Sequence, residues 1–209
     1  MRFSSTPDIT VILPTFNRAA YLKTAISSVI EQTFSNWELI VVDDGSSDDS
    51  FDTVSPFLER HPNIRYMKHK NRKVALSRNA GIQASFGRYI TFLDSDDHYL
   101  ENHLASRIAL MEAMPDVDLL SGGFLCDEPT MVKDCRNLDK MIDIRECTLC
   151  GTIFGKRELF FAVEGFRNLD YAEDTDLWER ASTIFTVKKI DNPRSYVYQR
   201  ANDSITLKY

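Results

Sequence analysis

Residues 9–45, ITVILPTFNRAAYLKTAISSVIEQTFSNWELIVVDDG, decide the fold class of this chain. The stretch begins with an apolar, β-branched run at 9–13 and ends with another at 37–42, and such runs are typical of buried strands. Between the two runs, apolar residues recur at helical spacing and share one face: Leu22, Ala25, Ile26, Val29 and Ile30. A strand, a crossover helix and a second strand form a βαβ unit, which predicts a parallel sheet.

The same alternation of patterns continues along the chain. We expect a second helix after Ser46-Ser47, whose hydroxyls suit an N-cap, with His61-Pro62 at its end and three side chains turned inward: Phe51, Val54 and Leu58. Strands are expected at 64–67, 89–93 and 117–120. A helix is expected at 75–85, closed by Gly87, and another is marked by Leu100, Leu104, Ile108 and Met111.

The last part of the chain has a looser pattern. Residues 122–144 combine two glycines, a proline and mixed charge, which predicts a loop-rich insertion. Regular order returns at 151–155, and we expect a helix from about Asp174 and strands near 185–190 and 195–199. The predicted fold class is α/β, a Rossmann-like mixed, mainly parallel sheet with helices on both faces, in a single domain over residues 1–209.

Composition limits the classes of function. The 209 residues are 43% apolar and 27% charged, which suits a globular domain with a full core. The net charge of -6, with Lys and Arg scattered, argues against a nucleic-acid partner. No apolar run reaches the roughly 18 residues of a membrane span, and residues 1–8 lack an apolar signal core. We therefore expect a cytoplasmic protein, compatible with peripheral attachment at the inner face of the cell membrane.

The four cysteines lie in one stretch, at Cys126, Cys135, Cys147 and Cys150. Cys147-Thr-Leu-Cys150 has the spacing of half a zinc site or a redox pair. The other two cysteines are irregularly spaced and no histidine lies nearby. Reduced, buried thiols are therefore the expected state in a cytosolic chain, and the role of the cluster stays open.

Polar residues follow three of the predicted strands. The first strand runs into Pro14-Thr-Phe-Asn-Arg18, the second into Asp43-Asp44-Gly45-Ser46 and the fourth into Asp94-Ser-Asp-Asp97. Ligands of doubly wound sheets bind at the carboxyl ends of the strands, so these groups are expected on one rim. Pro14 to Arg18 also suits a plain turn with an Asn cap, and Asp43-Asp44-Gly45 also suits a plain turn.

The acidic group after the fourth strand favours a metal. Carboxylates packed together repel one another unless a cation or hydrogen bonds compensate. Mg²⁺ and Mn²⁺ prefer oxygen ligands and are commonly shared with substrate phosphates. We therefore expect Asp96 and Asp94 to bind one of these metals, with a diphosphate completing its coordination shell. The chain has neither Gly-x-x-x-x-Gly-Lys nor Gly-x-Gly-x-x-Gly after the first strand, which disfavours P-loop and dinucleotide-binding proteins.

Together these residues resemble a known family, the inverting glycosyltransferases of family 2, which have the GT-A fold of nucleotide-diphospho-sugar transferases. Five motifs match in order and spacing over nearly the whole chain: Pro14-Thr-Phe-Asn-Arg18, Val42-Asp-Asp-Gly-Ser-Ser-Asp48, Ser77-Arg-Asn-Ala-Gly81, Leu93-Asp-Ser-Asp-Asp97 and Glu173-Asp174. The resemblance implies a metal-dependent sugar transferase in cell-surface polysaccharide or glycoconjugate synthesis. It also implies a nucleotide-binding half at 1–100 and an acceptor and catalytic half at 101–209.

The resemblance assigns roles to single residues. Donor-binding residues would be Pro14, Thr15, Phe16, Asn17, Arg18, Asp43, Asp44, Arg78, Asp94 and Ser95. Among them Pro14, Thr15 and Phe16 would line the base pocket, Asp44 would read the base, Asp43 would support its turn and Arg78 would lie near the phosphates. Asp96 would hold the metal, and Asp94 would contact the ribose or the metal's outer shell. Asp174, with Glu173 beside it, would be the catalytic base, although both acids also suit a helix amino terminus.

The chain departs from the family pattern in two places. Lys73 stands where many members have glycine, and residues 200–204 lack a metal-binding His that many members carry. The metal site is therefore expected to be weaker or completed differently. Many relatives also continue beyond the position of Tyr209, so acceptor recognition is expected to be incomplete in this chain.

Three functions are compatible with these residues. A UDP-linked sugar is the first expectation for the donor of a transferase, with a saccharide or a lipid-linked saccharide as acceptor. A nucleotidyltransferase also uses acidic metal ligands, but it usually has a Gly-rich basic loop after the first strand, and Pro14 to Arg18 is not one. A noncatalytic nucleotide-sugar-binding module is the alternative from another class. The sugar, base, acceptor, product linkage and oligomeric state are not readable from the sequence.

Overall fold

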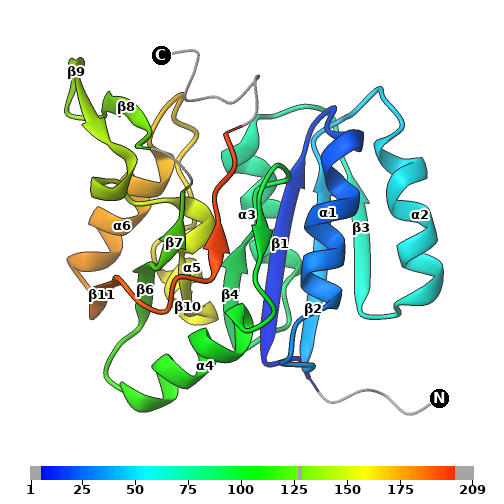
Figure 1. Cartoon of the computed structure of the whole chain (residues 1–209), viewed down its shortest axis with the longest axis horizontal. Coiled ribbons are helices and arrows are strands. Elements are labelled where there is room, and N and C mark those ends of the chain that lie inside the picture. The colour runs from blue at the N-terminus through cyan, green and yellow to red at the C-terminus, as the bar shows by residue number, and fades with distance from the viewer. Residues whose placement is uncertain (1–5, 127–128, 201–209) are drawn as a thin grey trace.

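A seven-stranded sheet forms the centre of the molecule, seen in a computed structural model that describes residues 6–126 and 129–200 (Figure 1). The strand order is β11-β6-β10-β4-β1-β2-β3, and only β10 runs antiparallel to its neighbours. The strands are β1 (Ile9–Thr15), β2 (Trp37–Asp43), β3 (Ile64–Lys68), β4 (Tyr89–Phe92), β6 (Leu119–Gly122), β10 (Phe154–Lys156) and β11 (Val187–Ile190). The mixed, mainly parallel sheet confirms the predicted fold class.

Helices cover both faces of this sheet because its central strands are apolar on both sides. Val11 and Leu13 of β1 belong to one hydrophobic cluster and Ile12 to the other, as the two-residue period of a strand requires. The first cluster is covered by α1 (Ala19–Ile30), α2 (Ser50–Arg60) and α4 (His103–Ala113). The second is covered by α3 (Val74–Ala84), α5 (Arg157–Ala162) and α6 (Glu173–Ser182).

The segment 122–144 is more ordered than the predicted loop-rich insertion. Strand β8 (Met131–Asp134) pairs antiparallel with β9 (Asn137–Asp143) in a two-stranded sheet, and short 3-10 helices follow at Ile144–Glu146 and Cys150–Thr152. The prediction was wrong because most of β9 is exposed and polar, so the alternation that usually indicates a strand is weak. The hairpin stands beside α6 in Figure 1.

A second small sheet joins three distant segments. Strand β12 (Tyr196–Val197) lies between β5 (His98–Tyr99) and β7 (Phe124–Leu125). Its pairing with β5 brings the end of the described chain to the residues that directly follow the acidic group at 94–97. The predicted strand at 195–199 is thus present, shortened to two residues.

The start of α2 differs from the prediction. The helix begins at Ser50, so Ser46 and Ser47 lie in the preceding turn and do not cap it. Val54 faces the core as expected, but the Phe51 side chain is 48% exposed and its ring meets the edge of Tyr66. The hydroxyls of Ser46 and Ser47 instead contact Asn17 in the turn after β1.

Two further boundaries also differ. Helix α3 ends at Ala84, and Gly87 does not close it. Gly87 instead allows a close approach to β1, since a Cβ atom there would lie 2.5 Å from the Thr10 backbone nitrogen. Leu100 precedes α4, which begins at His103, and its side chain is 38% exposed.

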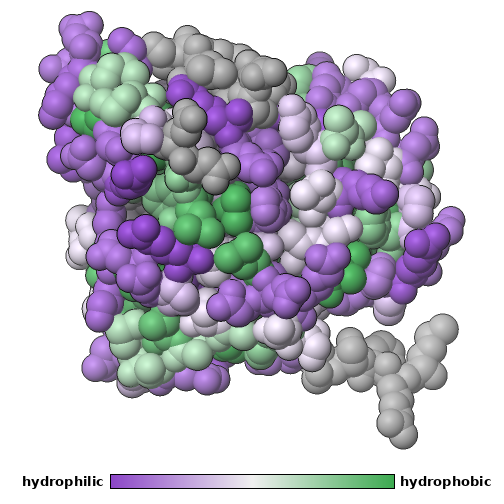
Figure 2. All heavy atoms as spheres, viewed as in Figure 1, coloured by the Kyte–Doolittle hydropathy of each residue, from purple (hydrophilic) through white to green (hydrophobic). Residues whose placement is uncertain are grey.

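The surface is mainly polar on the side drawn in Figure 2, with apolar residues gathered near β7. Leu125 of β7 is among the exposed large apolar side chains. Among residues 6–126 and 129–200, no helix is both long and apolar enough to cross a membrane.

Candidate active site

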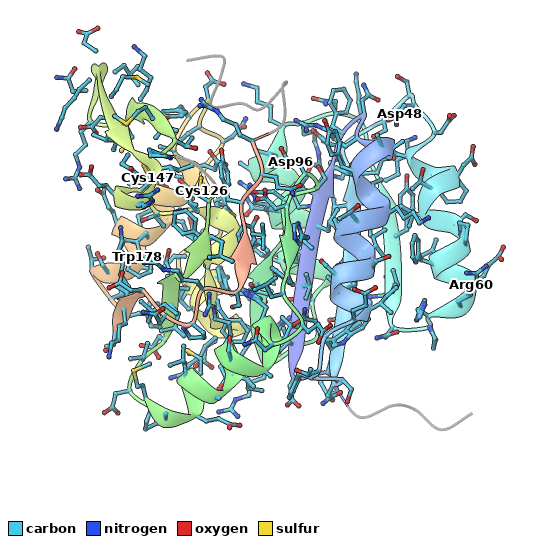
Figure 3. All side chains as sticks on the ribbon, viewed as in Figure 1. Asp48, Arg60, Asp96, Cys126, Cys147 and Trp178 are labelled. Carbon is cyan, nitrogen blue, oxygen red and sulfur yellow. The ribbon has the colours of Figure 1, made fainter. Side chains whose placement is uncertain are left out.

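A pocket of about 1230 Å³ lies where the carboxyl ends of the sheet strands meet the second half of the chain. Figure 3 shows Asp96 near those strand ends, with Cys147 and Trp178 on the side of α6. The walls bring together twelve of the thirteen predicted site residues: Pro14, Thr15, Phe16, Asn17, Arg18, Asp44, Arg78, Asp94, Ser95, Asp96, Glu173 and Asp174. Asp43 is the predicted residue that does not line it.

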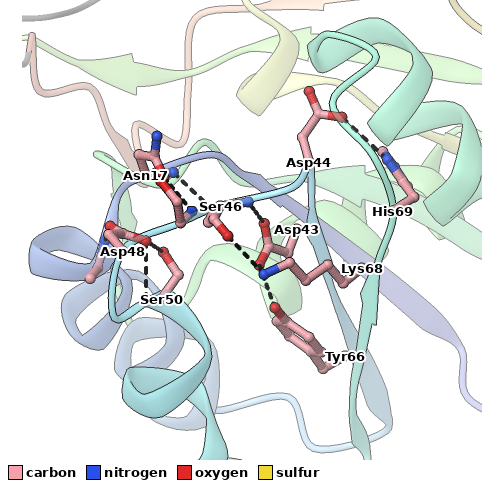
Figure 4. A network of polar contacts seen from close by, with 11 residues as sticks. Asn17, Asp43, Asp44, Ser46, Asp48, Ser50, Tyr66, Lys68 and His69 are labelled. Carbon is pink, nitrogen blue, oxygen red and sulfur yellow. Dashed lines mark hydrogen bonds and ion pairs between the residues drawn. The ribbon is translucent and has the colours of Figure 1, made fainter.

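The turn after β1 presents an aromatic ring to the pocket. Phe16 is 46% exposed and lines the pocket, so its ring is accessible to a ligand there. Asn17 adopts a positive φ of 52°, and its side-chain oxygen accepts a hydrogen bond from the Ser47 backbone at 2.8 Å. Its own backbone N–H donates to Ser46 Oγ at 2.9 Å (Figure 4). These bonds fix the turn after β1 against the turn after β2.

The two aspartates after β2 have different surroundings. Asp43 is fully buried, where it accepts hydrogen bonds from the Ser46 backbone at 2.6 Å and from the Tyr66 hydroxyl (Figure 4). Burial by itself raises the pKa of Asp43, but the hydrogen bonds from Tyr66 and Ser46 outweigh it and lower the pKa. Asp43 therefore supports the turn from behind.

Asp44 faces the pocket from the same turn. Its Oδ1 accepts a hydrogen bond from the Arg72 backbone at 2.8 Å, and His69 Nδ1 lies 3.3 Å from the same oxygen. The carboxylate is thus held between the turn after β2 and the loop before α3. A carboxylate fixed at a pocket wall can accept hydrogen bonds from a ligand's N–H or O–H groups.

The acidic residues after β4 also differ in their surroundings: two of them are partly exposed to the pocket and one is buried. Asp94 and Asp96 line the pocket with side chains 33% and 16% exposed, each beside an arginine. Asp97 also reaches the wall but is buried: its carboxylate accepts the Tyr196 hydroxyl and, at 2.7 Å, the Gln199 backbone N–H. Burial, followed by the charges of Asp94 and Asp96, raises the pKa of Asp97. Asp97 thus ties the acidic group to β12.

Arg78 connects the two halves of the site. Its guanidinium is nearly fully buried and donates to Asp94 Oδ1 at 2.8 Å and to Glu173 of α6. Both terminal nitrogens of this side chain are engaged by carboxylates. The predicted contact of Arg78 with donor phosphates stays a prediction, and the structure adds that it positions Asp94 and Glu173.

Asp174 occupies the first turn of α6. Its Oδ1 accepts the Thr175 backbone N–H at 2.7 Å, and its Oδ2 accepts the Cys150 backbone N–H at 3.1 Å. Burial, with the charge of Glu173, raises the pKa of Asp174 to about 7 against the opposing effect of Arg78. A carboxyl group with this pKa can exchange protons near neutral pH, as a general base must.

The residues present fit a divalent metal that is shared with a ligand. Within residues 6–126 and 129–200, no group of three or more His, Cys, Asp and Glu side chains is placed to hold a metal. Mg²⁺ and Mn²⁺ sites in phosphate-binding enzymes need only one or two carboxylates, because phosphate and water complete the shell. Asp96 and Asp94 supply such carboxylates at the wall of the pocket. Residues 200–204, where the sequence lacks the metal-binding histidine expected from the family resemblance, lie mostly outside the described residues.

Several wall residues escaped the sequence analysis. The second half of the chain lines the pocket through side chains of the hairpin, of α6 and of the loop before α6, which include Lys133, Lys140, Ile142, Tyr171 and Trp178. Val132 opposite Ile142 is the apolar pair that could have indicated the hairpin. Tyr196 and Cys150 hold Asp97 and Asp174, but the sequence carries no signal for such long-range contacts. None of the four cysteines, all of which lie within the described residues, forms a disulfide. Cys150 is buried as predicted, but the prediction of buried thiols was wrong for Cys135, which is exposed on the hairpin turn, and Cys126 and Cys147 are half-buried.

Comparison with known sequences places this site in a family context. Residues 10–130 match the sequence profile of glycosyl transferase family 2, more than half of the chain. An uncharacterized glycosyltransferase of Rickettsia bellii is 40% identical over 50% of this chain and 15% of its own length. The Escherichia coli UDP-Glc:alpha-D-GlcNAc-diphosphoundecaprenol beta-1,3-glucosyltransferase WfgD is 38% identical over 49% of this chain and 40% of its own length. The chain thus spans less than half the length of these curated relatives.

Solved structures share the fold. TarS residues 1–349 from S. aureus, in complex with UDP-GlcNAc, superposes with a TM-score of 0.80 at 20% identity, over 97% of this chain and 61% of that one. The mannosyltransferase PcManGT from Pyrobaculum calidifontis, in complex with GDP-Man and Mn²⁺, gives a TM-score of 0.74 at 20% identity, over 97% and 59%. At this identity the likeness shows a common GT-A fold.

Proposed function

The chain belongs to glycosyl transferase family 2, and we propose from this premise that it transfers a sugar from a UDP-linked donor to an acceptor hydroxyl with inversion. One observation carries the proposal: a single pocket is lined by the exposed ring of Phe16, by the carboxylates of Asp94 and Asp96, and by Asp174, whose pKa burial and Glu173 raise to about 7. UDP is favoured because WfgD is named for UDP-Glc and TarS binds UDP-GlcNAc. Because PcManGT binds GDP-Man, a guanine nucleotide is included in the experiment below.

In this proposal the first half of the chain holds the donor. Phe16 stacks on the base, and Asp44 accepts hydrogen bonds from it or from the ribose. Asp94 and Asp96 hold Mg²⁺ or Mn²⁺, which when bound would neutralise the charge of the diphosphate leaving group. Arg78 keeps Asp94 in place through its buried ion pair.

The second half supplies the base and the acceptor side. The oxygen of the acceptor hydroxyl attacks the anomeric carbon from the face opposite the diphosphate, and Asp174 takes the proton of that hydroxyl at the same time. Glu173 raises the pKa of Asp174 and is itself held by Arg78, so it tunes the base without taking the proton. The hairpin side chains and Trp178 form the wall against which an acceptor saccharide, free or lipid-linked, would lie.

The test is an assay of sugar transfer and release. The chain is incubated with UDP-Glc, UDP-GlcNAc or GDP-Man, with Mn²⁺ and with EDTA, in the presence of lipid-linked and free saccharides. We expect nucleoside diphosphate to be released only with metal, and NMR of the product should show an inverted anomeric centre. A parallel reaction contains UTP or GTP with a sugar phosphate, and release of pyrophosphate in it would instead indicate a nucleotidyltransferase. Tight donor binding without any turnover would indicate a binding module.

A further inference from the structure

Lys73 has a backbone conformation that glycine normally supplies. Its φ is 73°, and it directly precedes the first residue of α3. A lysine is strained in this conformation, because its Cβ crowds the backbone. Such strain persists only where the surrounding structure enforces it, and it is concentrated at ligand sites. The position therefore raises the question of what the side chain does there.

The surrounding loop fixes Lys73 beside the proposed donor site. The backbone N–H of Arg72 donates to Asp44 at 2.8 Å, which anchors the residue just before Lys73. Gly45 packs so closely on the same loop that a Cβ would lie 2.9 Å from the Asn71 nitrogen. One and a half helical turns further along, Arg78 contacts Asp94. Lys73 lines the pocket between these two points.

Each of three cations on this part of the wall is paired with a carboxylate. Arg18 lies 3.4 Å from Asp96, and Arg78 binds Asp94 and Glu173. Lys73 Nζ lies 2.5 Å from Asp170 Oδ1, in the loop before α6. The Lys73–Asp170 pair is by far the most exposed, with side chains 58% and 71% accessible. Exposed ion pairs are weak and buried ones are costly to break, so Lys73 is the cation most readily transferred to a ligand.

We propose that Lys73 binds the diphosphate of the donor, and that Asp170 is the counter-ion from which it is released when the donor enters. The inference rests on the function proposed above, because that function supplies the anionic ligand. Lysine can follow a phosphate as a mobile point charge, whereas the two arginines are held in their pairs. Transfer of the ammonium would also free the loop at Asp170, which leads into the helix of the proposed base.

The proposal predicts opposite effects of two substitutions in one ion pair. Lys73→Ala should weaken UDP binding in the presence of Mn²⁺ by about tenfold to a hundredfold, measured by calorimetry, because a charge-assisted contact is lost. Asp170→Asn should tighten UDP about twofold to fivefold, because the competing carboxylate is neutralised. A purely structural ion pair would give both variants the same direction of change.

Two further measurements separate the ammonium from the backbone. Lys73→Gly should weaken UDP as much as Lys73→Ala while raising Tm by about 2–4 °C, since glycine relieves the positive φ. UMP binding should change much less than UDP binding, because the nucleoside contacts are kept. Lys70→Ala serves as the matched control: Lys70 is exposed in the same loop and does not line the pocket.

The outcomes distinguish this inference from the proposed function. A wild-type chain that binds neither UDP nor GDP with Mn²⁺ would overturn the function and the inference together. If the wild type binds UDP and the affinity of Lys73→Ala equals those of the wild type and of Lys70→Ala, only the role of Lys73 is overturned. Weaker binding in Asp170→Asn, equal to that in Lys73→Ala, would likewise reduce the pair to a structural contact.

Discussion

Asp43 and Asp44 are adjacent in the chain, and their carboxylates nevertheless meet different surroundings. Asp43 accepts internal hydrogen bonds behind the turn, whereas Asp44 faces the pocket. Asp96 and Asp97 repeat this arrangement, because Asp97 is buried against Tyr196. In each motif one acid is held by internal hydrogen bonds and its neighbour faces the pocket. A dense acidic motif therefore overstates the number of carboxylates available for a metal.

Phe16 gives the first prediction at the residue scale. Its ring is exposed at the pocket wall, so Phe16→Ala should weaken UDP by about 1–3 kcal/mol if the ring stacks on the base. Calorimetry with Mn²⁺ measures the effect. Phe51→Ala is the control, because Phe51 is similarly exposed but lies outside the pocket. Equal affinities for both variants and the wild type would remove Phe16 from the donor site.

Asp174 gives the second prediction. If its carboxylate is the base, Asp174→Asn keeps the side-chain shape but cannot accept the proton, so kcat should fall by roughly 10² to 10⁴ with UDP affinity little changed. Initial rates and calorimetry on the same preparation measure both quantities. Loss of UDP binding together with turnover would point to a structural role at the start of α6, where the acid contacts Thr175.

The raised pKa of Asp174 makes a separate prediction about pH. Burial and Glu173 raise the pKa to about 7 while Arg78 opposes them, so the protonated, inactive form dominates below neutral pH. We expect kcat/KM to rise about tenfold per pH unit as pH increases toward 7 and then to level off. The residual activity of Asp174→Asn should lack this acid limb. A wild-type profile that is flat between pH 5 and 8 would contradict the assignment.

At the element scale, the sequence best predicted the helices and strands that have a clear local pattern of apolar residues. Within residues 9–113 every strand and helix except the two-residue β5 was predicted, because each has a local apolar pattern: a continuous run in β1 and a helical period in α1. The hairpin β8–β9 was missed because most of β9 is exposed and neither of its strands has such a pattern. The site residues on strand ends were predictable from topology, but the pairing of Arg78 with Glu173, 95 residues apart, was not.

Strand β12 is predicted to depend on one buried hydroxyl. Tyr196 is 1% exposed and its hydroxyl donates to the buried Asp97 carboxylate. Tyr196→Phe leaves that acceptor without the bond, so we expect a loss of about 1–3 kcal/mol in the free energy of unfolding, measured with urea. Tyr21→Phe, at a 36% exposed ring, should cost less than about 0.5 kcal/mol. Equal stability of the two variants would show that the contact contributes little.

At the scale of the whole molecule, the pocket exists only where the two halves of the chain meet. Lining residues between positions 14 and 97 form one side, those between positions 132 and 198 form the other, and Arg78 bridges the two halves. The sequence motifs indicated both sides, but they could not give the acceptor wall, because that surface depends on how the hairpin packs near α6. The division into a nucleotide-binding half and an acceptor half stays a prediction.

A ligand that needs this assembled pocket binds the folded chain and not the unfolded one, so donor and metal together should raise Tm. At a UDP concentration of 100 Kd the expected stabilisation is about 2.7 kcal/mol, or about 5–10 °C for a chain of this size. Because Asp96 lies at the wall where the metal is proposed, the shift should require Mn²⁺ and disappear in Asp96→Ala, while that variant without ligand unfolds near the wild-type Tm. Scanning calorimetry with UDP plus Mn²⁺, UDP plus EDTA and Mn²⁺ alone separates the contributions. An equal shift in EDTA would show that UDP binds without metal, and a shift retained in Asp96→Ala would move the metal to other ligands.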